Sequence, residues 1–284
     1  MRQPRWFAAS LFALAVGLAV VAVLGPLALD VIRYRYSETM LNQATGLDAF
    51  ALVVVAPIAV VAGVLALRQH RSAPLVALAP TGFSVYMLVQ YVIGPEYLTI
   101  DGNGEQWFLL FVALFVLAGV VLFQAWSLAS VSDWSPRRAR LRAATLFALA
   151  AFVIGGMYLS NGFVGAMRDF PAFVADRAAS SELDEHPTAY WLVALLDLAV
   201  VTPRTVATAI GVLRGSAWAR AAYYGVIGWF ALVPGSVASM ALVMVVREDP
   251  AADAGRAVVF VIAAGAFLAL AARTFRSLTP PRSA

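Results

Sequence analysis

The fold is decided by an uncharged stretch near the middle of the chain, 106-QWFLLFVALFVLAGVVLFQAWSLA-129. A run of about 18 or more apolar residues is long enough, as a helix, to cross the roughly 30 Å hydrocarbon core of a bilayer. Because backbone groups in lipid must form hydrogen bonds within their own segment, we expect this stretch to be a transmembrane α-helix.

Seven further apolar runs lie on either side of this stretch, joined by short connections. The composition agrees, because 62% of the 284 residues are hydrophobic and 13% are charged, whereas soluble domains carry roughly twice that charged fraction. We predict an all-α membrane protein that forms a single polytopic domain over residues 1–284. The eight expected spans are residues 6–29, 48–67, 73–93, 106–129, 143–163, 188–213, 221–246 and 257–272.

The 20 basic residues are all arginine, and they are divided unequally between the two sides that these spans define. Thirteen arginines fall on the side of both termini, whereas 14 of the 16 acidic residues fall on the opposite side. Arginine-rich short loops remain in the cytoplasm. We therefore predict that both termini are cytoplasmic. The net positive charge is then explained by this orientation in the membrane. We expect the lipid bilayer to be the partner of the chain, and we expect no binding of nucleic acid.

The absence of cysteine and lysine excludes disulfides, thiol chemistry and lysine Schiff bases. We expect no cofactor, because the chain has no phosphate-binding glycine loop and no HExxH motif. We interpret the acidic residues at 101–105 as a turn and those at 182–186 as an acidic loop, rather than as metal sites. Abundant Ala, Val and Arg without Lys is typical of a GC-rich bacterial genome, such as that of an actinobacterium, so we expect a bacterial cytoplasmic membrane.

A shift of 146 residues aligns the second span with the sixth and predicts an internal duplication. Residues 51–68 then lie over residues 197–214 without a gap, and several Leu, Val and Pro positions coincide. Four spans return the chain to the same side of the membrane, so the duplication would be parallel, with halves at 1–140 and 141–284.

Asp197 and Arg204 form the charged pair that the expected spans enclose. Seven residues are close to two helical turns, so both side chains are expected on one face of the sixth span, about 10.5 Å apart along its axis. Each charge costs roughly 2.5–3.5 kcal/mol at mid-membrane, so the pair needs a structural or functional reason. The candidate intramembrane polar site consists of Asp197, Arg204, Thr208 and Tyr190 on the sixth span and Tyr86 and Gln90 on the third.

Two interpretations of this site stay open. The pair is either a structural link that fixes the sixth span in the bundle, or part of a binding site for a substrate, proton or ion. The binding site would make the protein a small-molecule or ion binder or transporter. The alternative is a non-catalytic scaffold or sensor that packs against a partner membrane protein. An enzyme acting on lipid is less favoured, because acid–base groups are few.

The connection after the fifth span contains Asp169, Phe170, Pro171 and Phe173. An Asp N-cap followed by Pro, with Phe at positions three apart, predicts a short helix on the membrane surface. A lid over an outward cavity is the alternative interpretation of the same residues.

Three stretches of the chain resemble a group of bacterial integral membrane proteins of unknown function. The resemblance implies the multi-span fold and no particular activity. Arg204 departs from the group's pattern, in which an apolar residue follows the proline. The stretches are Gly82-Phe-Ser-Val-Tyr86 with Tyr91 and Gly94, Trp107-Phe-Leu-Leu-Phe-Val-Ala-Leu, and Leu196-Asp197-Leu198 with Val200-Val201-Thr202-Pro203, Leu213-Arg214 and Trp218.

Overall fold

The computed structural model describes residues 3–175, 186–276 and 278, and it confirms the expected all-α architecture. No strand occurs among these residues, and eight helices are long and apolar enough to cross a membrane. The chain is therefore a multi-pass membrane protein. The eight spans are Arg5–Leu24, Glu38–Leu67, Ala73–Ile93, Gly104–Leu128, Pro136–Asn161, Pro187–Leu213, Ala217–Val246 and Ala254–Arg276.

Three of the spans contain a π-helical segment. The second contains α2 (Glu38–Phe50), the π-helical η1 (Ala51–Val55) and α3 (Ala56–Leu67), and the sixth contains α10 (Pro187–Leu196), the π-helical η5 (Asp197–Val201) and α11 (Thr202–Leu213). The fifth contains α6 (Pro136–Ala151), the π-helical η3 (Phe152–Tyr158) and the 3₁₀ turn η4 (Leu159–Asn161). The other spans are α1 (Arg5–Leu24), α4 (Ala73–Ile93), η2 (Gly104–Trp107) with α5 (Phe108–Leu128), α12 (Ala217–Val246) and α13 (Ala254–Arg276).

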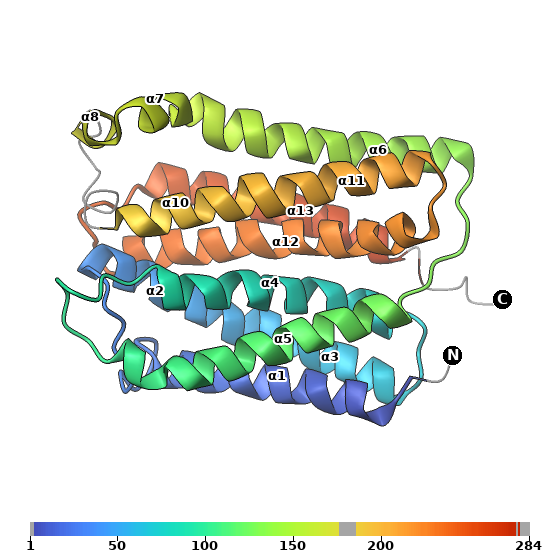
Figure 1. The fold of residues 1–284 in the computed structure, drawn as a ribbon, viewed down its shortest axis with the longest axis horizontal. Helices are drawn as coiled ribbons and strands as arrows, with labels where there is room; N and C mark the ends of the chain where they lie inside the picture. Colours follow the sequence, from blue (N-terminus) through green and yellow to red (C-terminus); the bar gives the residue numbers. More distant parts are fainter. Residues whose placement is uncertain (1–2, 176–185, 277, 279–284) are drawn as a thin grey trace.

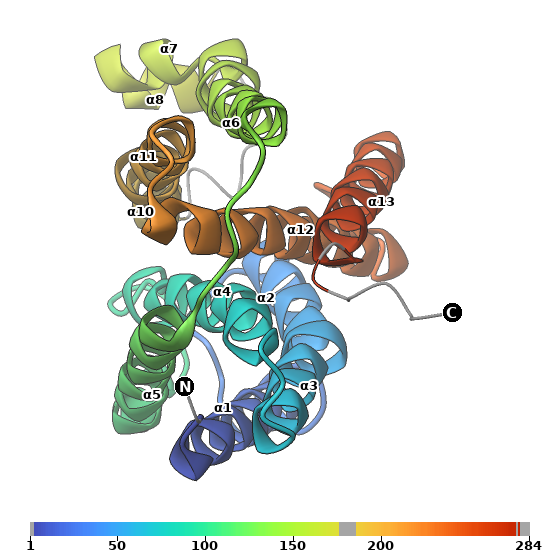
Figure 2. The same cartoon turned by 90° about the vertical axis from the view of Figure 1, so that its right-hand side faces the viewer.

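The eight spans run side by side, and α1 begins at the end of the bundle where α13 finishes (Figure 1). We call this end the base, with the turns at 68–72, 129–135 and 214–216, and the opposite end the crown, with the connections at 25–37 and 247–253. Viewed along the bundle, α1 to α5 form a compact group, whereas α6 and α11 to α13 are more widely spread (Figure 2). α12 joins the two groups, because it packs against α2 and α4 as well as against α11 and α13.

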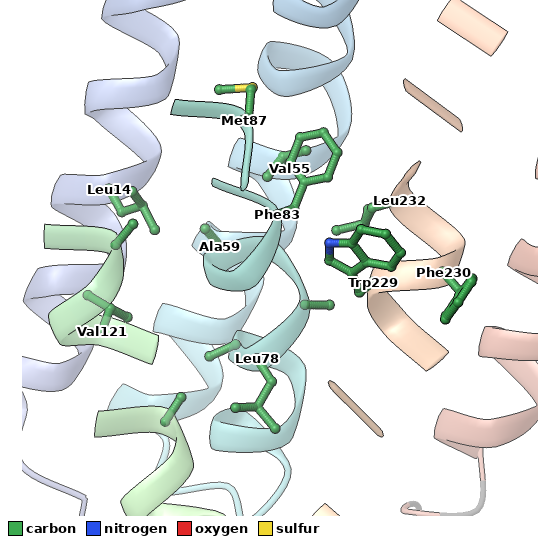
Figure 3. Close-up of a cluster of buried hydrophobic side chains, with 14 of the residues drawn as sticks. Leu14, Val55, Ala59, Leu78, Phe83, Met87, Val121, Trp229, Phe230 and Leu232 are labelled. Atoms are coloured by element: carbon green, nitrogen blue, oxygen red, sulfur yellow. The ribbon is translucent and has the colours of Figure 1, made fainter. Parts of the chain in front are cut away.

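A continuous apolar core fills the first group and extends to α12 (Figure 3). Leu14 of α1 and Val121 of α5 lie on one side of α4, and Trp229 and Leu232 of α12 lie on the other. All four side chains are buried. The interface between the two groups is therefore packed with apolar side chains at this level of the membrane.

The start of α2 corrects the expected boundary of the second span, which begins at Glu38 rather than at residue 48. The early turns are polar, so hydropathy does not reveal them, but Thr39 and Asn42 in these turns are buried against the connection after α12. Thr39 and Asn42 donate hydrogen bonds to the carboxylate of Asp249, at 3.2 and 2.7 Å, and Arg247 donates to the Asn42 side chain at 2.9 Å. These bonds link the two helix groups at the crown.

Gly46 of α2 and Ser239 of α12 are small residues that allow the two helices to approach closely. A Cβ atom on Gly46 would lie 2.5 Å from the Cα of Met240, and the hydroxyl of Ser239 donates to the Gly46 carbonyl oxygen at 2.7 Å. Gly235, about one turn earlier on α12, faces the ring of Phe50 of α2. Small residues are the usual means by which membrane helices pack this tightly.

The predicted 146-residue shift agrees with the position of the π-helical segments. η1 and η5 begin at residues 51 and 197 and finish at 55 and 201, and the α-helices after them also begin and finish 146 residues apart. Pro57 and Pro203 occupy equivalent positions in these helices. Superposition of the two halves remains a prediction of the duplication.

The short helix expected after the fifth span is present as α8 (Phe170–Ala175), preceded by α7 (Phe163–Arg168). The carboxylate of Asp169 accepts a hydrogen bond from the backbone N–H of Ala172 at 3.1 Å, which caps the helix as expected. The ring of Phe170 packs against Tyr190 and Trp191 at the beginning of the sixth span.

Candidate functional site

A cavity of about 450 Å³ lies between the two helix groups on the crown side, and we call it the crown cavity. α2, α4, α10, α12 and α13 all contribute to its wall. The lining is mainly apolar with several methionines and a few polar groups, a combination typical of small-molecule sites. The polar and ionisable residues of the lining are Gln43, Tyr86, Gln90, Tyr158, His186, Tyr190, Asp197, Ser236, Asp253 and Arg256.

Asp197 lies in the wall of the crown cavity with 4% of its surface exposed. The hydroxyl of Tyr86 on α4 donates to its Oδ1 atom at 3.0 Å, and the hydroxyl of Tyr158 on η3 donates to its Oδ2 atom at 2.8 Å. Hydrogen bonds to a carboxylate are stronger than neutral ones and offset part of the cost of burial. A carboxylate can accept more hydrogen bonds than these two phenols donate, so Asp197 can also bind a ligand in the cavity.

The position of Asp197 is explained by the local sequence. Pro203 has no backbone N–H, so the regular helical bond to the carbonyl of residue 199 cannot form. The chain widens into the π-helical η5, which begins at Asp197 and finishes just before Thr202. Single π-helical turns occur frequently at functional sites.

Four of the six residues predicted for the polar site lie together in the crown cavity: Tyr86, Gln90, Tyr190 and Asp197. Gln90 lies one turn beyond Tyr86 on α4, and its side chain donates to the Tyr86 carbonyl oxygen at 3.3 Å. Tyr190 belongs to the aromatic cluster with Phe170 at the crown end of the sixth span.

The other two predicted residues, Arg204 and Thr208, line a different pocket, so the expected ion pair between Asp197 and Arg204 is wrong. The seven-residue spacing places two side chains on one face only if the helix is regular. A π-helical turn accommodates about one extra residue, which rotates the remainder of the helix by roughly 100°. η5 begins at Asp197 and ends before Arg204, so the two side chains face different parts of the molecule.

Arg204 lines a pocket of about 410 Å³ between α4, α5, α11 and α12, which we call the Arg204 pocket. Its guanidinium lies over the ring of Trp229, 5.5 Å from the ring centroid. The Nε and Nη2 atoms are buried, and among the described residues neither has a hydrogen-bond partner. The hydroxyl of Thr208 donates to the Arg204 carbonyl oxygen at 2.7 Å and is thereby occupied by the backbone.

Trp229 separates the two sites. Its ring meets that of Tyr86 edge to face, with the centroids 5.5 Å apart, and on another side it meets the guanidinium of Arg204. On α4, Phe83 lines the crown cavity and Leu78 lines the Arg204 pocket (Figure 3). A layer of apolar side chains around Trp229 therefore divides the interface into a crown part and a base part.

Sequence reasoning missed the most deeply buried carboxylate of the described residues, Asp48 on α2. Its surface is 0% exposed, and it accepts hydrogen bonds from the hydroxyls of Tyr91 on α4 and, at 3.4 Å, of Tyr34 in the connection after α1. Burial raises the pKa of Tyr34 well above its ordinary value, so this phenol keeps its proton and donates. The signal that could have revealed Asp48 is Ser37 followed by Glu38, a capping pattern that begins a helix ten residues earlier.

The remaining polar groups offer less specific chemistry. A base cavity of about 630 Å³ is lined by Arg71, Arg138 and Arg142, in keeping with the arginine-rich turns there, and the Arg142 guanidinium stacks 3.9 Å above the Trp134 ring. Of the acidic loop at 182–186, only His186 belongs to the described residues; its Nε2 atom accepts from the backbone N–H of Ser37 at 2.9 Å. No group of three metal-ligating side chains occurs in the described part of the chain.

Comparison with known proteins finds no relative of this chain. No family model, no curated protein and no solved structure matches the chain. The functional conclusion therefore depends on the arrangement of the residues themselves.

Proposed function

We propose that this membrane protein binds a small molecule or ion at Asp197 in the crown cavity and moves it across the membrane between the two helix groups. The observation that carries the proposal is a buried carboxylate in the wall of a cavity of about 450 Å³, held by phenols from two other spans. Buried acids within membrane spans commonly mark substrate or proton pathways.

The lining indicates the chemical class of the ligand. Asp197 supplies a negative charge, and the phenol oxygens of Tyr86 and Tyr158 can accept further hydrogen bonds beside it. Met87, Met157 and other methionines lie around them. Methionine side chains are flexible and adapt to ligands of irregular shape. These features favour a compact cation with an apolar body, such as an organic amine, over an anion or a sugar.

The division by Trp229 supports transport rather than binding alone. Trp229 contacts both Tyr86 of the crown cavity and Arg204 of the other pocket, at the interface of two groups that α12 joins. Alternating access at the interface of two structural halves is a common transport mechanism. With the arginine-rich base in the cytoplasm, the crown cavity would be the outward-facing site of a protein in a bacterial cytoplasmic membrane.

The test uses purified protein and a panel of primary to quaternary amines with apolar groups of increasing size. We expect at least one of them to raise the melting temperature of the wild type and of Asp48→Asn, but not of Asp197→Asn. Asp48 is the matched control, because it is equally buried and bonded to two tyrosines but does not line the crown cavity. Charge movement in proteoliposomes, measured with the same amine, then tests transport.

The competing hypothesis is a non-catalytic scaffold or sensor. α13 favours it, because many of its apolar side chains, such as Val258, Ile262 and Leu268, are exposed on the outside of the bundle. Lipid contact accounts for the same exposure. A scaffold predicts that no amine stabilises the protein and that Asp48→Asn and Asp197→Asn differ only in their effect on folding.

A further inference from the structure

Arg204 is the least satisfied charged group among the described residues that line the cavities within the bundle. Two of its guanidinium nitrogens are buried and have no hydrogen-bond partner in the described part of the chain. The contact of the guanidinium with the ring of Trp229 is favourable. Burying a cation without a counter-charge is costly in protein and more so in lipid. Asp197, the nearest buried acid in the sequence, is bonded to Tyr86 and Tyr158 in the crown cavity instead.

Apart from Thr208, whose hydroxyl bonds to the Arg204 carbonyl oxygen, the other residues that line the Arg204 pocket are apolar. Leu78 of α4, Leu122 of α5 and Val226 of α12 line it, and its volume is about 410 Å³. Arg204 itself lies nine residues before the end of α11, which is about 13 Å along the helix axis. The guanidinium is therefore well inside the hydrocarbon region of a bilayer, whose half-thickness is roughly 15 Å.

The rim of this pocket is on the outer surface of the bundle. Phe123 and Trp126 of α5 are 74% and 41% exposed, and Trp218 of α12 is 46% exposed. The rings of Trp126 and Trp218 lie 6.5 Å apart at the base end of the pocket. Exposed apolar rings on a membrane helix face lipid, and tryptophans near the span ends lie at the headgroup level. The pocket can therefore be entered from the bilayer.

We propose that the Arg204 pocket binds an amphiphile from the surrounding membrane, with one carboxylate or phosphate on Arg204 and an apolar chain along the pocket wall. A planar guanidinium matches both anionic groups with paired hydrogen bonds. The wall and the aromatic rim supply the surface for the chain. This site is separate from the crown cavity, and it does not depend on amine binding at Asp197.

The test compares delipidated wild type with Arg204→Gln, which removes the charge and keeps a shorter side chain that can still form hydrogen bonds. Palmitate, phosphatidylglycerol and hexadecanol are the three probes, and native mass spectrometry and melting temperature are the readouts. We expect palmitate or phosphatidylglycerol to bind the wild type at least about tenfold more tightly than Arg204→Gln, as expected for loss of a charge-assisted hydrogen bond. The probe that binds more tightly identifies the head group as carboxylate or phosphate.

A second pair of variants keeps Arg204 and changes the space around it. Gly119 lines the pocket, and a Cβ atom there would meet nothing within 4 Å; the same is true of Gly265 on α13, which does not line it. Gly119→Leu should therefore weaken binding of the amphiphile, whereas Gly265→Leu should leave it unchanged. Asp197→Asn should also leave it unchanged, which separates this site from the proposed amine site.

Three results would overturn the proposal. One is equal binding of the anionic probes to the wild type and to Arg204→Gln. Another is binding of hexadecanol as tight as that of palmitate and phosphatidylglycerol, since the uncharged head group supplies no counter-charge for the guanidinium. The third is unchanged binding in Gly119→Leu, which would place the amphiphile elsewhere on the protein.

Discussion

At the scale of single residues, Asp48 and Asp197 are two buried aspartates that use the same chemistry for different ends. Asp48 and Asp197 each accept hydrogen bonds from two tyrosine hydroxyls, and α4 supplies one of the tyrosines in both cases, Tyr91 and Tyr86. Asp48 is enclosed and ties the connection after α1 to α2 and α4. Asp197 borders a cavity, so the same arrangement leaves its carboxylate within reach of a ligand.

This difference predicts that two single-atom deletions affect amine binding differently. Tyr91→Phe removes a hydrogen-bond donor to the enclosed Asp48 carboxylate and should lower the free energy of unfolding by about 1–3 kcal/mol. Binding of the amine in the crown cavity should be unchanged. Tyr158→Phe removes a donor from Asp197 and should also weaken stabilisation by the amine. Melting curves with and without ligand measure both effects. Equal losses of amine binding in the two variants would show that the crown cavity is not the binding site.

At the scale of helices, small residues decide how closely the two groups meet. A Cβ atom on Gly46 would lie 2.5 Å from the backbone of α12, whereas one on Gly82 of α4 would meet nothing within 4 Å. Gly46→Ala should therefore destabilise the protein by about 1–3 kcal/mol through overpacking. Gly82→Ala should be neutral or slightly stabilising, because alanine is the better helix former. If thermal unfolding of the two variants were the same, the close α2–α12 contact would be disproved.

The helices also show where sequence reasoning succeeds and where it fails. The number and type of the spans can be predicted from hydropathy, because lipid permits few alternatives. The grouping of Tyr86, Gln90 and Asp197 can be predicted from side-chain chemistry. The pairing of Asp197 with Arg204 fails because the π-helical η5 changes the helical phase between them. Asp48 is missed because the first turns of α2 are polar and bury their side chains against α12 rather than facing lipid.

At the scale of the whole molecule, the distribution of arginine predicts the orientation. The base end of the bundle, with its turns and the adjoining helix ends, carries most of the arginines, and the crown carries most of the acids. We expect reporter tags near residue 140 and at the C-terminus to lie in the cytoplasm and a tag near residue 180 to lie outside. Compartment-specific reporters measure this directly. A cytoplasmic tag near residue 180 would reverse the orientation of the crown cavity.

The proposed function depends on one property of the whole molecule, which is that water reaches the crown cavity from the crown. The chain contains no cysteine, so single cysteines can be introduced without a background. Ser236 on α12 lines the crown cavity, and Ser84 on α4 is equally buried but does not line it. Serine to cysteine is a small change at both positions.

The most direct measurement is labelling of Ser236→Cys and Ser84→Cys by a membrane-impermeant thiol reagent added outside intact cells. We expect the cysteine at 236 to be labelled, to be protected by the stabilising amine, and to lose this protection when Asp197→Asn is added. The cysteine at 84 should remain unlabelled until the protein is denatured. A cysteine at 236 that is labelled no faster than the one at 84, although tags place the crown outside, would contradict an open cavity at Asp197.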